Sequence, residues 1–108
     1  MTVNVALAQI NSIVGDLTGN GAKIADYARR AAEQGADIVV TPELSLVGYP
    51  PEDLLLRRSF YAKSAEALAA LAATLAPLKD LHLIVGHPLS RGTAYYNAAS
   101  VLCNGSVM

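Results

Sequence analysis

The chain has 108 residues, of which 53% are hydrophobic and 16% are charged, and its formal net charge is −1. This length suits one small domain or part of one, and the charges are spread without runs, which argues against a nucleic-acid partner. Because the sequence shows no signal peptide, no run near the ~18 apolar residues of a membrane span and a single cysteine, we expect a cytoplasmic protein without a membrane partner.

The first part of the chain predicts a strand, a helix and a second strand. Apolar side chains occupy both faces of Val3 to Ile10, which is typical of a strand that is buried on both sides. Apolar residues then recur at helical spacing from Ile24 to Ala32, and Gly35 stands where a left-handed cap would end the helix. The β-branched run Asp37 to Thr41 predicts a second strand, parallel to the first because a helix connects them.

A loop and a second helix follow. Glycine and proline mark Pro42 to Pro51 as the loop, and its last proline suits the first turn of a short helix that Glu52 and Asp53 would favour. The second amphipathic helix is predicted over Phe60 to Ala76, where Pro77 stops it.

The last part of the chain returns to a β pattern. Leu81 to Val85 predicts a third apolar strand, Tyr95 to Cys103 predicts another, and Asn104-Gly105 is a strong hairpin signal. The returning strand is short, so we expect residues 1–108 to be the amino-terminal portion of a domain that continues beyond Met108. These elements predict the α/β class, with two helices that cover one face of a sheet and leave its opposite apolar face exposed.

One carboxylate has a position that suits catalysis. Glu43 directly follows an apolar strand, and ligands of open α/β sheets bind beyond the carboxyl ends of the strands. Pro42 restricts the backbone just before it, although a solvated loop glutamate is the alternative interpretation. Tyr49, in the same loop, either lines a substrate pocket or packs as an ordinary aromatic side chain.

Four segments resemble the nitrilase superfamily in order and spacing: ALAQINSIVGDLTGN, ADIVVTPELSLVGYPPEDLLL, LIVGHP and YYNAASVL. The stretch GYPPEDLLL is similar to the form carried by glutamine-dependent NAD synthetases. The resemblance covers nearly the whole chain and implies a four-layer αββα sandwich with a Cys, Glu, Lys triad, in which Glu43 is the general base and glutamine is the substrate. It also implies a homo-oligomer and a carboxy-terminal synthetase domain, where ATP and magnesium serve the amidation of nicotinic acid adenine dinucleotide.

The cysteine and the lysine of that triad are not expected among these residues. Cys103 lies in a strand beside a tight turn, with no histidine expected near it, and is interpreted as a packing residue. Lys23, Lys63 and Lys79 are interpreted as solvated charges, and His87 as a residue without an assigned partner. The segment GNGAKI satisfies no phosphate-loop pattern, so we expect no cofactor or metal site within this chain.

Two other functions stay open at this point. The chain could belong to another nitrilase-family carbon-nitrogen hydrolase, such as one that acts on carbamoyl compounds. It could instead be a short binding module without catalytic activity.

Overall fold

The computed structural model describes residues 2–51, 54 and 56–108, so the helical turn expected at Glu52 and Asp53 lies outside the described residues. A five-stranded sheet has the order β1-β2-β3-β4-β5. Its strands are β1 (Val5–Leu7), β2 (Ile38–Val40), β3 (His82–Arg91), β4 (Ala94–Cys103) and β5 (Ser106–Val107). The first two strands are parallel, as predicted, the third is parallel to them, and the last two join them in antiparallel hairpins.

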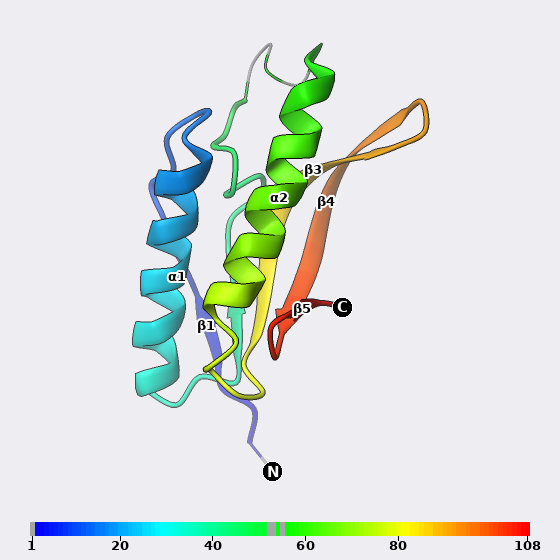
Figure 1. Ribbon diagram of the computed structural model, residues 1–108. Coiled ribbons are helices and arrows are strands. Elements are labelled where there is room, and N and C mark those ends of the chain that lie inside the picture. The colour runs from blue at the N-terminus through cyan, green and yellow to red at the C-terminus, as the bar shows by residue number, and fades with distance from the viewer. Residues whose placement is uncertain (1, 52–53, 55) are drawn as a thin grey trace.

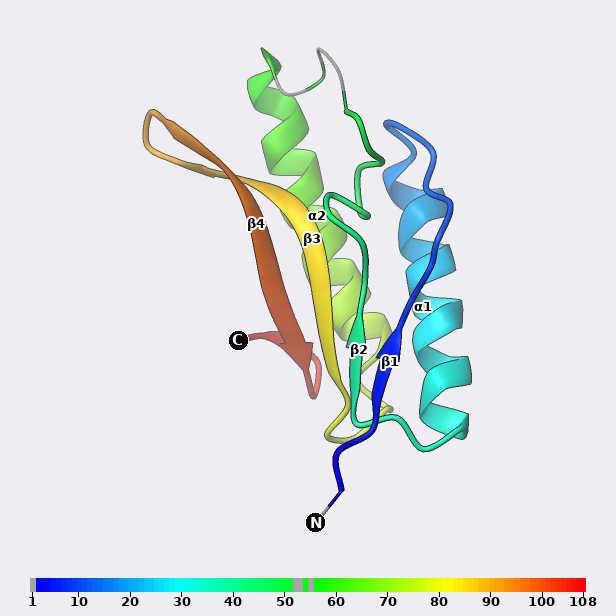
Figure 2. The ribbon, with the colours of Figure 1, turned by 180° about the vertical axis from the view of Figure 1, so that it is seen from behind.

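Both helices lie on the same face of this sheet, as Figures 1 and 2 show from opposite sides. Helix α1 spans Leu17–Glu33 and begins well before the predicted periodic segment, because Asp16 caps it by accepting a 3.0 Å hydrogen bond from the Gly19 N–H. Gly35 follows its end at φ +87°, which confirms the expected left-handed position. Helix α2, Arg58–Thr74, lies within two residues of its prediction. No helix in the described part of the chain is long and apolar enough to cross a membrane.

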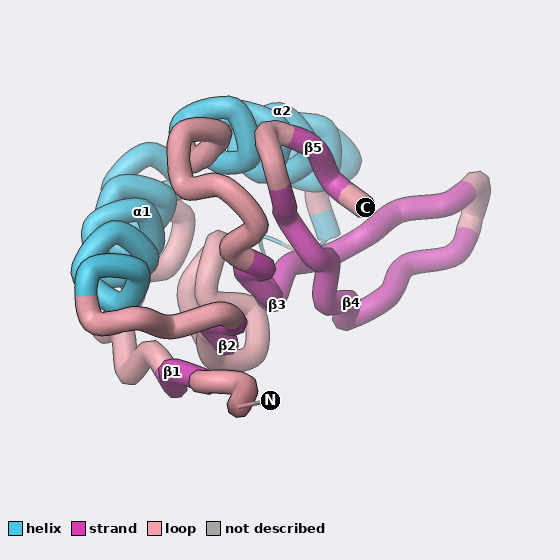
Figure 3. The backbone as a smooth tube through the Cα atoms, turned by 90° about the horizontal axis from the view of Figure 1, so that it is seen from below, coloured by secondary structure: helices cyan, strands magenta, loops and turns pink. Residues whose placement is uncertain are grey.

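The core lies between the helices and the sheet, and the other face of the sheet is open (Figure 3). Ile24 of α1, Val39 of β2 and Val85 of β3 are completely buried in this layer. On the opposite face, Val5 is 54% exposed and Leu7 is 69% exposed. The interpretation of the first strand as buried on both faces is therefore wrong for the described chain, whereas the expected exposure of one apolar face is confirmed.

Strand β3 is longer than the sequence predicted. Its expected end was Val85, but it continues through Pro88 to Arg91 and turns into β4 through Gly92-Thr93. Strand β2 pairs with β3 only as far as Ile84, so Pro88 lies where β3 has β4 on one side and no strand of the described residues on the other. Proline lacks an N–H donor and is tolerated at such edges.

The second hairpin agrees with its prediction. Asn104 and Gly105 have φ values of 51° and 86°, and positive values at both central residues are what a type I′ turn requires. The turn pairs Cys103 with Ser106 and Leu102 with Val107. It lies at the end of the sheet where the parallel strands begin, opposite the loop that carries Glu43 (Figure 1).

Candidate active site

The loop that follows β2 presents Glu43 at the carboxyl end of the parallel strands. The Glu43 side chain is exposed, and it makes no hydrogen bond or ion pair with any other described residue. The loop around it is buried, since Ser45 is 2% exposed and Leu46 and Val47 are 0% exposed. The Glu43 carboxylate is therefore exposed and unpaired, whereas the loop residues on both sides of it are largely buried.

Thr41 connects this loop to β3. Its N–H and its hydroxyl both donate to the carbonyl oxygen of Ile84, each at 3.0 Å. The same hydroxyl oxygen accepts hydrogen bonds from the Ser45 hydroxyl at 2.7 Å and from the Gly86 N–H at 3.3 Å. One side chain thus joins the residues before and after Glu43 to the neighbouring strand.

Gly86 lets β3 pass directly against the turn that carries Glu43. A Cβ atom at this position would lie 2.6 Å from the Leu44 nitrogen, 2.6 Å from the Pro42 carbonyl oxygen and 3.1 Å from the Glu43 carbonyl carbon. These are backbone atoms that cannot move aside independently. Any larger residue at position 86 would displace the loop.

Leu44 anchors the turn from its other side. It packs with Val47 and with Phe60 of α2 in a small separate cluster, and it is 4% exposed. Its φ of 51° is in the left-handed region, which non-glycine residues rarely adopt unless the surrounding structure holds them there.

The segment GNGAKI contributes Asn20, a structural role that the sequence analysis did not identify. Asn20 is completely buried, and its side chain bonds both the N–H and the carbonyl oxygen of Ile13, and the carbonyl oxygen of Leu46. Ser12 donates a further hydrogen bond to the Ser45 carbonyl oxygen at 2.7 Å. The segment before α1 and the loop after β2 are therefore tied together, and a buried asparagine in a glycine-rich context was the available signal.

Tyr49 is 64% exposed, and no described contact brings it to Glu43. The aromatic side chains near the loop come instead from α2 and β4. A cavity of about 150 Å³ adjoins Leu44 and is lined by Tyr61, Tyr95 and Tyr96, among others. The rings of Tyr61 and Tyr95 have centroids 4.7 Å apart; burial raises the pKa of Tyr61, and the nearby Tyr95 raises it further.

Cys103 lies at the opposite end of the sheet from Glu43, because it ends β4 beside the start of β3. The expectation that no histidine is near it is wrong: its sulfur is 3.9 Å from Nδ1 of His82. That nitrogen is also 3.0 Å from the Asp80 carbonyl oxygen, which can only accept, so Nδ1 carries a proton. It therefore cannot take the proton of the thiol, and the geometry supports the packing interpretation.

His87 is 3% exposed and has two partners. Its Nδ1 lies 3.0 Å from the Pro88 carbonyl oxygen and donates to it, and its Nε2 lies 2.6 Å from the Ser100 hydroxyl oxygen. This saturates both ring nitrogens and gives His87 a structural role between β3 and β4. Among the lysines, Lys23 bonds the Asn11 carbonyl oxygen at 2.8 Å and remains at the surface.

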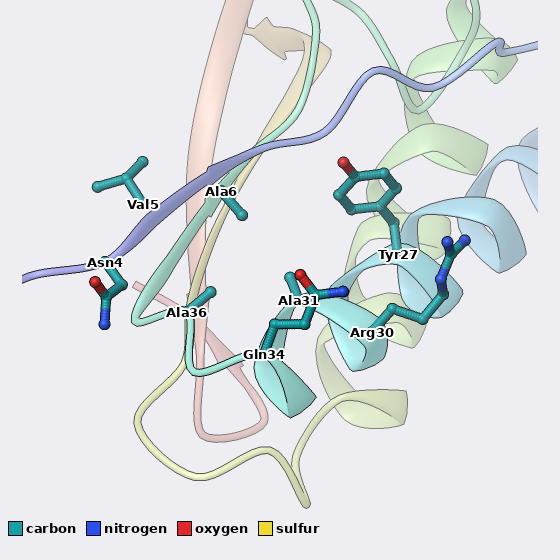
Figure 4. Close-up of a pocket in the computed structure, with 8 residues that line it drawn as sticks. All are labelled: Asn4, Val5, Ala6, Tyr27, Arg30, Ala31, Gln34 and Ala36. Atoms are coloured by element: carbon teal, nitrogen blue, oxygen red, sulfur yellow. The ribbon is translucent and has the colours of Figure 1, made fainter.

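A separate pocket of about 280 Å³ lies at the other end of the sheet, between β1 and the last turns of α1 (Figure 4). Asn4, Ala6 and Ala36 line it on the strand side, and Tyr27 and Gln34 on the helix side. This pocket contains no carboxylate and lies away from Glu43. The residues that the structure describes also contain no group of three or more His, Cys, Asp or Glu side chains that could hold a metal ion.

The sequence is similar to that of glutamine-dependent NAD(+) synthetases. It is 45% identical over 107 residues to the enzyme of Xanthomonas campestris pv. campestris, an alignment that covers 98% of this chain and 19% of that protein. The chain thus spans about a fifth of the length of the curated relatives that it matches.

Solved structures agree with this similarity. A glutamine-dependent NAD(+) synthetase from Cytophaga hutchinsonii matches with a TM-score of 0.90 at 27% identity, over 99% of this chain and 18% of that one. The corresponding enzyme of Acinetobacter baumannii, in complex with ADP, matches with a TM-score of 0.82 at 36% identity, over 96% and 19%.

An amidase from Nesterenkonia sp. AN1 matches with a TM-score of 0.79 at 25% identity, over 99% of this chain and 42% of that one. That structure is a Glu-to-Gln mutant in which acrylamide has added to the active-site cysteine. Residues 4–107 match the carbon-nitrogen hydrolase family, and the chain is a member of that family.

Proposed function

We propose that this chain is the amino-terminal part of the glutaminase domain of a glutamine-dependent NAD⁺ synthetase. The observation that carries the proposal is the carboxylate of Glu43, free at the carboxyl end of the parallel strands on a buried loop. Identities of 45% and 43% to two synthetases, over 98% and 97% of this chain, favour the synthetase over other carbon-nitrogen hydrolases.

In this proposal Glu43 is the general base. It takes the proton of a cysteine thiol while the thiolate attacks the side-chain carboxamide of glutamine, and it returns that proton to the departing ammonia. The thioester is then hydrolysed by a water molecule that gives a proton to Glu43 and the hydroxyl to the acyl carbon, which releases glutamate and the thiol. A lysine stabilises the oxyanion of each tetrahedral intermediate.

The cysteine and the lysine would come from sequence outside this chain, because Cys103 lies at the wrong end of the sheet and already packs beside His82. The ammonia would pass to a synthetase domain that uses ATP and magnesium. The ADP bound to the Acinetobacter baumannii relative supports a nucleotide site in such a domain.

In the same proposal, the exposed face of the sheet is the surface on which a second sheet packs. Val5 and Leu7 are apolar and more than half exposed. A second sheet packed on this face, about 10 Å away, would complete the four-layer αββα sandwich. The helices of the present chain would then form one outer layer.

The complete enzyme, meaning this chain joined to the remainder of the synthetase, provides the test. Glu43→Gln keeps the size of the side chain and removes the proton-accepting charge, so glutamine-dependent synthesis should fall by at least about 100-fold. Synthesis from added ammonia should stay near the parent value. Glu66→Gln, at an exposed position of α2, is the matched control and should leave both activities unchanged. A Glu43→Gln enzyme that still hydrolyses glutamine within about tenfold of the parent would contradict the proposal.

A further inference from the structure

We propose that Thr41 is a positioning residue for Glu43, which it holds through Ser45 and Gly86. The inference rests on the proposed role of Glu43 as general base and adds to it the means by which an exposed carboxylate is kept in place. Thr41 is 9% exposed and lies two positions before Glu43, and its hydroxyl bonds Ile84, Ser45 and Gly86.

The Thr41 hydroxyl has no unused hydrogen-bonding capacity. A threonine hydroxyl has one proton to donate and two lone pairs to accept with. The proton goes to the Ile84 carbonyl oxygen, and the lone pairs accept from the Ser45 hydroxyl and the Gly86 N–H. A saturated, buried hydroxyl fixes the relative positions of all three partners.

Glu43 lies midway along the segment that this hydroxyl closes. The 2.7 Å bond from Ser45 to Thr41 joins the residues two before and two after Glu43. The Ser45 N–H also donates to the Pro42 carbonyl oxygen at 3.1 Å. The backbone of Glu43 is therefore held in a closed turn, and only the rotatable bonds of its side chain remain free.

Gly86, on the neighbouring strand β3, makes the remaining contacts that hold this turn. Its carbonyl oxygen accepts from the Leu46 N–H at 3.2 Å, while its own N–H donates to Thr41. The absence of a side chain lets its backbone lie against Pro42 and Leu44, so β3 serves as the support on which the turn rests. Leu44 has a φ in the unfavourable left-handed region, so the turn depends on its contacts with β3 to keep this conformation.

The positions of these residues indicate that the hydrogen bonds place the Glu43 carboxylate, in addition to stabilising the loop. The hydrogen bonds converge on the segment from Thr41 to Ser45, and the one polar side chain of that segment that is exposed and unpaired is the Glu43 carboxylate. General-base catalysis requires such a group within hydrogen-bonding reach of the proton it takes, and small displacements are costly.

The test compares Thr41→Val with Thr41→Ser in the complete enzyme. Valine keeps the shape and removes the hydroxyl, so the kcat for glutamine hydrolysis should fall roughly 10- to 100-fold, with little change in the KM for glutamine. Thr41→Ser restores the hydroxyl and should recover most of the activity. Ammonia-dependent synthesis should not change in either variant. Ser100→Ala, which removes a part-buried hydroxyl bond to His87, is the control and should leave the kcat of the folded enzyme unchanged.

A mutant cycle separates positioning from a general loss of structure. If Thr41 acts through Glu43, Thr41→Val should cause no further loss of glutamine hydrolysis in the Glu43→Gln enzyme. Should Thr41→Val fail to fold, Ser45→Ala removes the donor to Thr41 with a smaller change and should give the same selective loss of kcat.

Two results would overturn the inference, and they are distinguishable. If Glu43→Gln abolishes glutamine hydrolysis while folded Thr41→Val or Ser45→Ala retains it within about twofold, positioning by Thr41 is wrong and the proposed function stands. If Glu43→Gln itself remains active, the proposed role of Glu43 fails, and the inference fails with it.

Discussion

The side-chain amide of Asn20 donates a 3.1 Å hydrogen bond to the carbonyl oxygen of Leu46, which joins the first turn of α1 to the loop that carries Glu43. The same amide bonds the carbonyl oxygen of Ile13 at 2.7 Å, and its oxygen accepts from the Ile13 N–H at 2.8 Å. One buried side chain thus satisfies the backbone of two loops that are distant in sequence.

Asn20→Ala should be strongly destabilising, because it removes three hydrogen bonds and leaves the buried carbonyl oxygen of Leu46 without its partner, although the Ile13 carbonyl oxygen keeps its bond from the Asp16 N–H. We expect a loss of about 3 kcal/mol, seen as a lower melting temperature of the complete enzyme. Asn4→Ala is the matched control: the Asn4 side chain makes one exposed hydrogen bond, to the Gly35 carbonyl oxygen, and its removal should cost less than about 1 kcal/mol. Equal melting temperatures for the two variants would show that the Asn20 bonds do not hold the loops.

Two glycines with empty space around them should respond to alanine in opposite directions. At both Gly21 and Gly35 an added Cβ atom would meet nothing within 4 Å. Gly21 lies inside α1, so Gly21→Ala should stabilise the fold by about 0.5–1 kcal/mol. Gly35 has φ +87°, so Gly35→Ala should destabilise it by roughly 1–2 kcal/mol. Melting temperatures that shift in the same direction would contradict the φ-based explanation.

The elements that depend on local pattern were predicted well from the sequence. The apolar spacing around Ile24 and along α2 gave both helices, because one face of each packs on the sheet. The Asn104-Gly105 turn was also identified, since few residue pairs accept positive φ at both positions. The start of α1 was placed too late because Gly19 and Gly21 weaken the helical pattern, and the cap at Asp16 decides where the helix begins.

The features that depend on distant partners were missed. The third strand was predicted to end at Val85, and only the short reach of β2 makes Pro88 acceptable within β3. Sequence position singled out Glu43, but nothing in the pattern showed that Thr41 and Gly86 hold its loop, because those contacts cross between strands. The proximity of His82 to Cys103 arises in the same way, from the register of β3 with β4.

Cys103 should be dispensable for glutamine hydrolysis. Its sulfur packs near a ring nitrogen that already carries a proton, so Cys103→Ala should cost roughly 1 kcal/mol in stability and no activity in the complete enzyme. A thiol-directed glutamine analogue should label a different cysteine, which peptide mass spectrometry would identify. Labelling of Cys103 would reverse this assignment.

The exposed face of the sheet should make residues 1–108 associate when they are prepared alone. Val3, Val5 and Leu7 are each more than half exposed on the edge strand β1 and the segment before it, and an open apolar face beside an unpaired edge favours self-association. At micromolar concentration we expect oligomers in sedimentation velocity and binding of a hydrophobic dye. The double variant Val5→Thr, Leu7→Thr places β-branched side chains at both positions and lowers the apolar area, so it should bind less dye and sediment closer to a monomer. The matched variant Lys23→Thr, Lys63→Thr changes the outer surfaces of the helices and should not reduce association. A parent chain that sediments as a compact monomer without dye binding would show that this face needs no cover, and would favour a self-sufficient binding module over part of a larger enzyme.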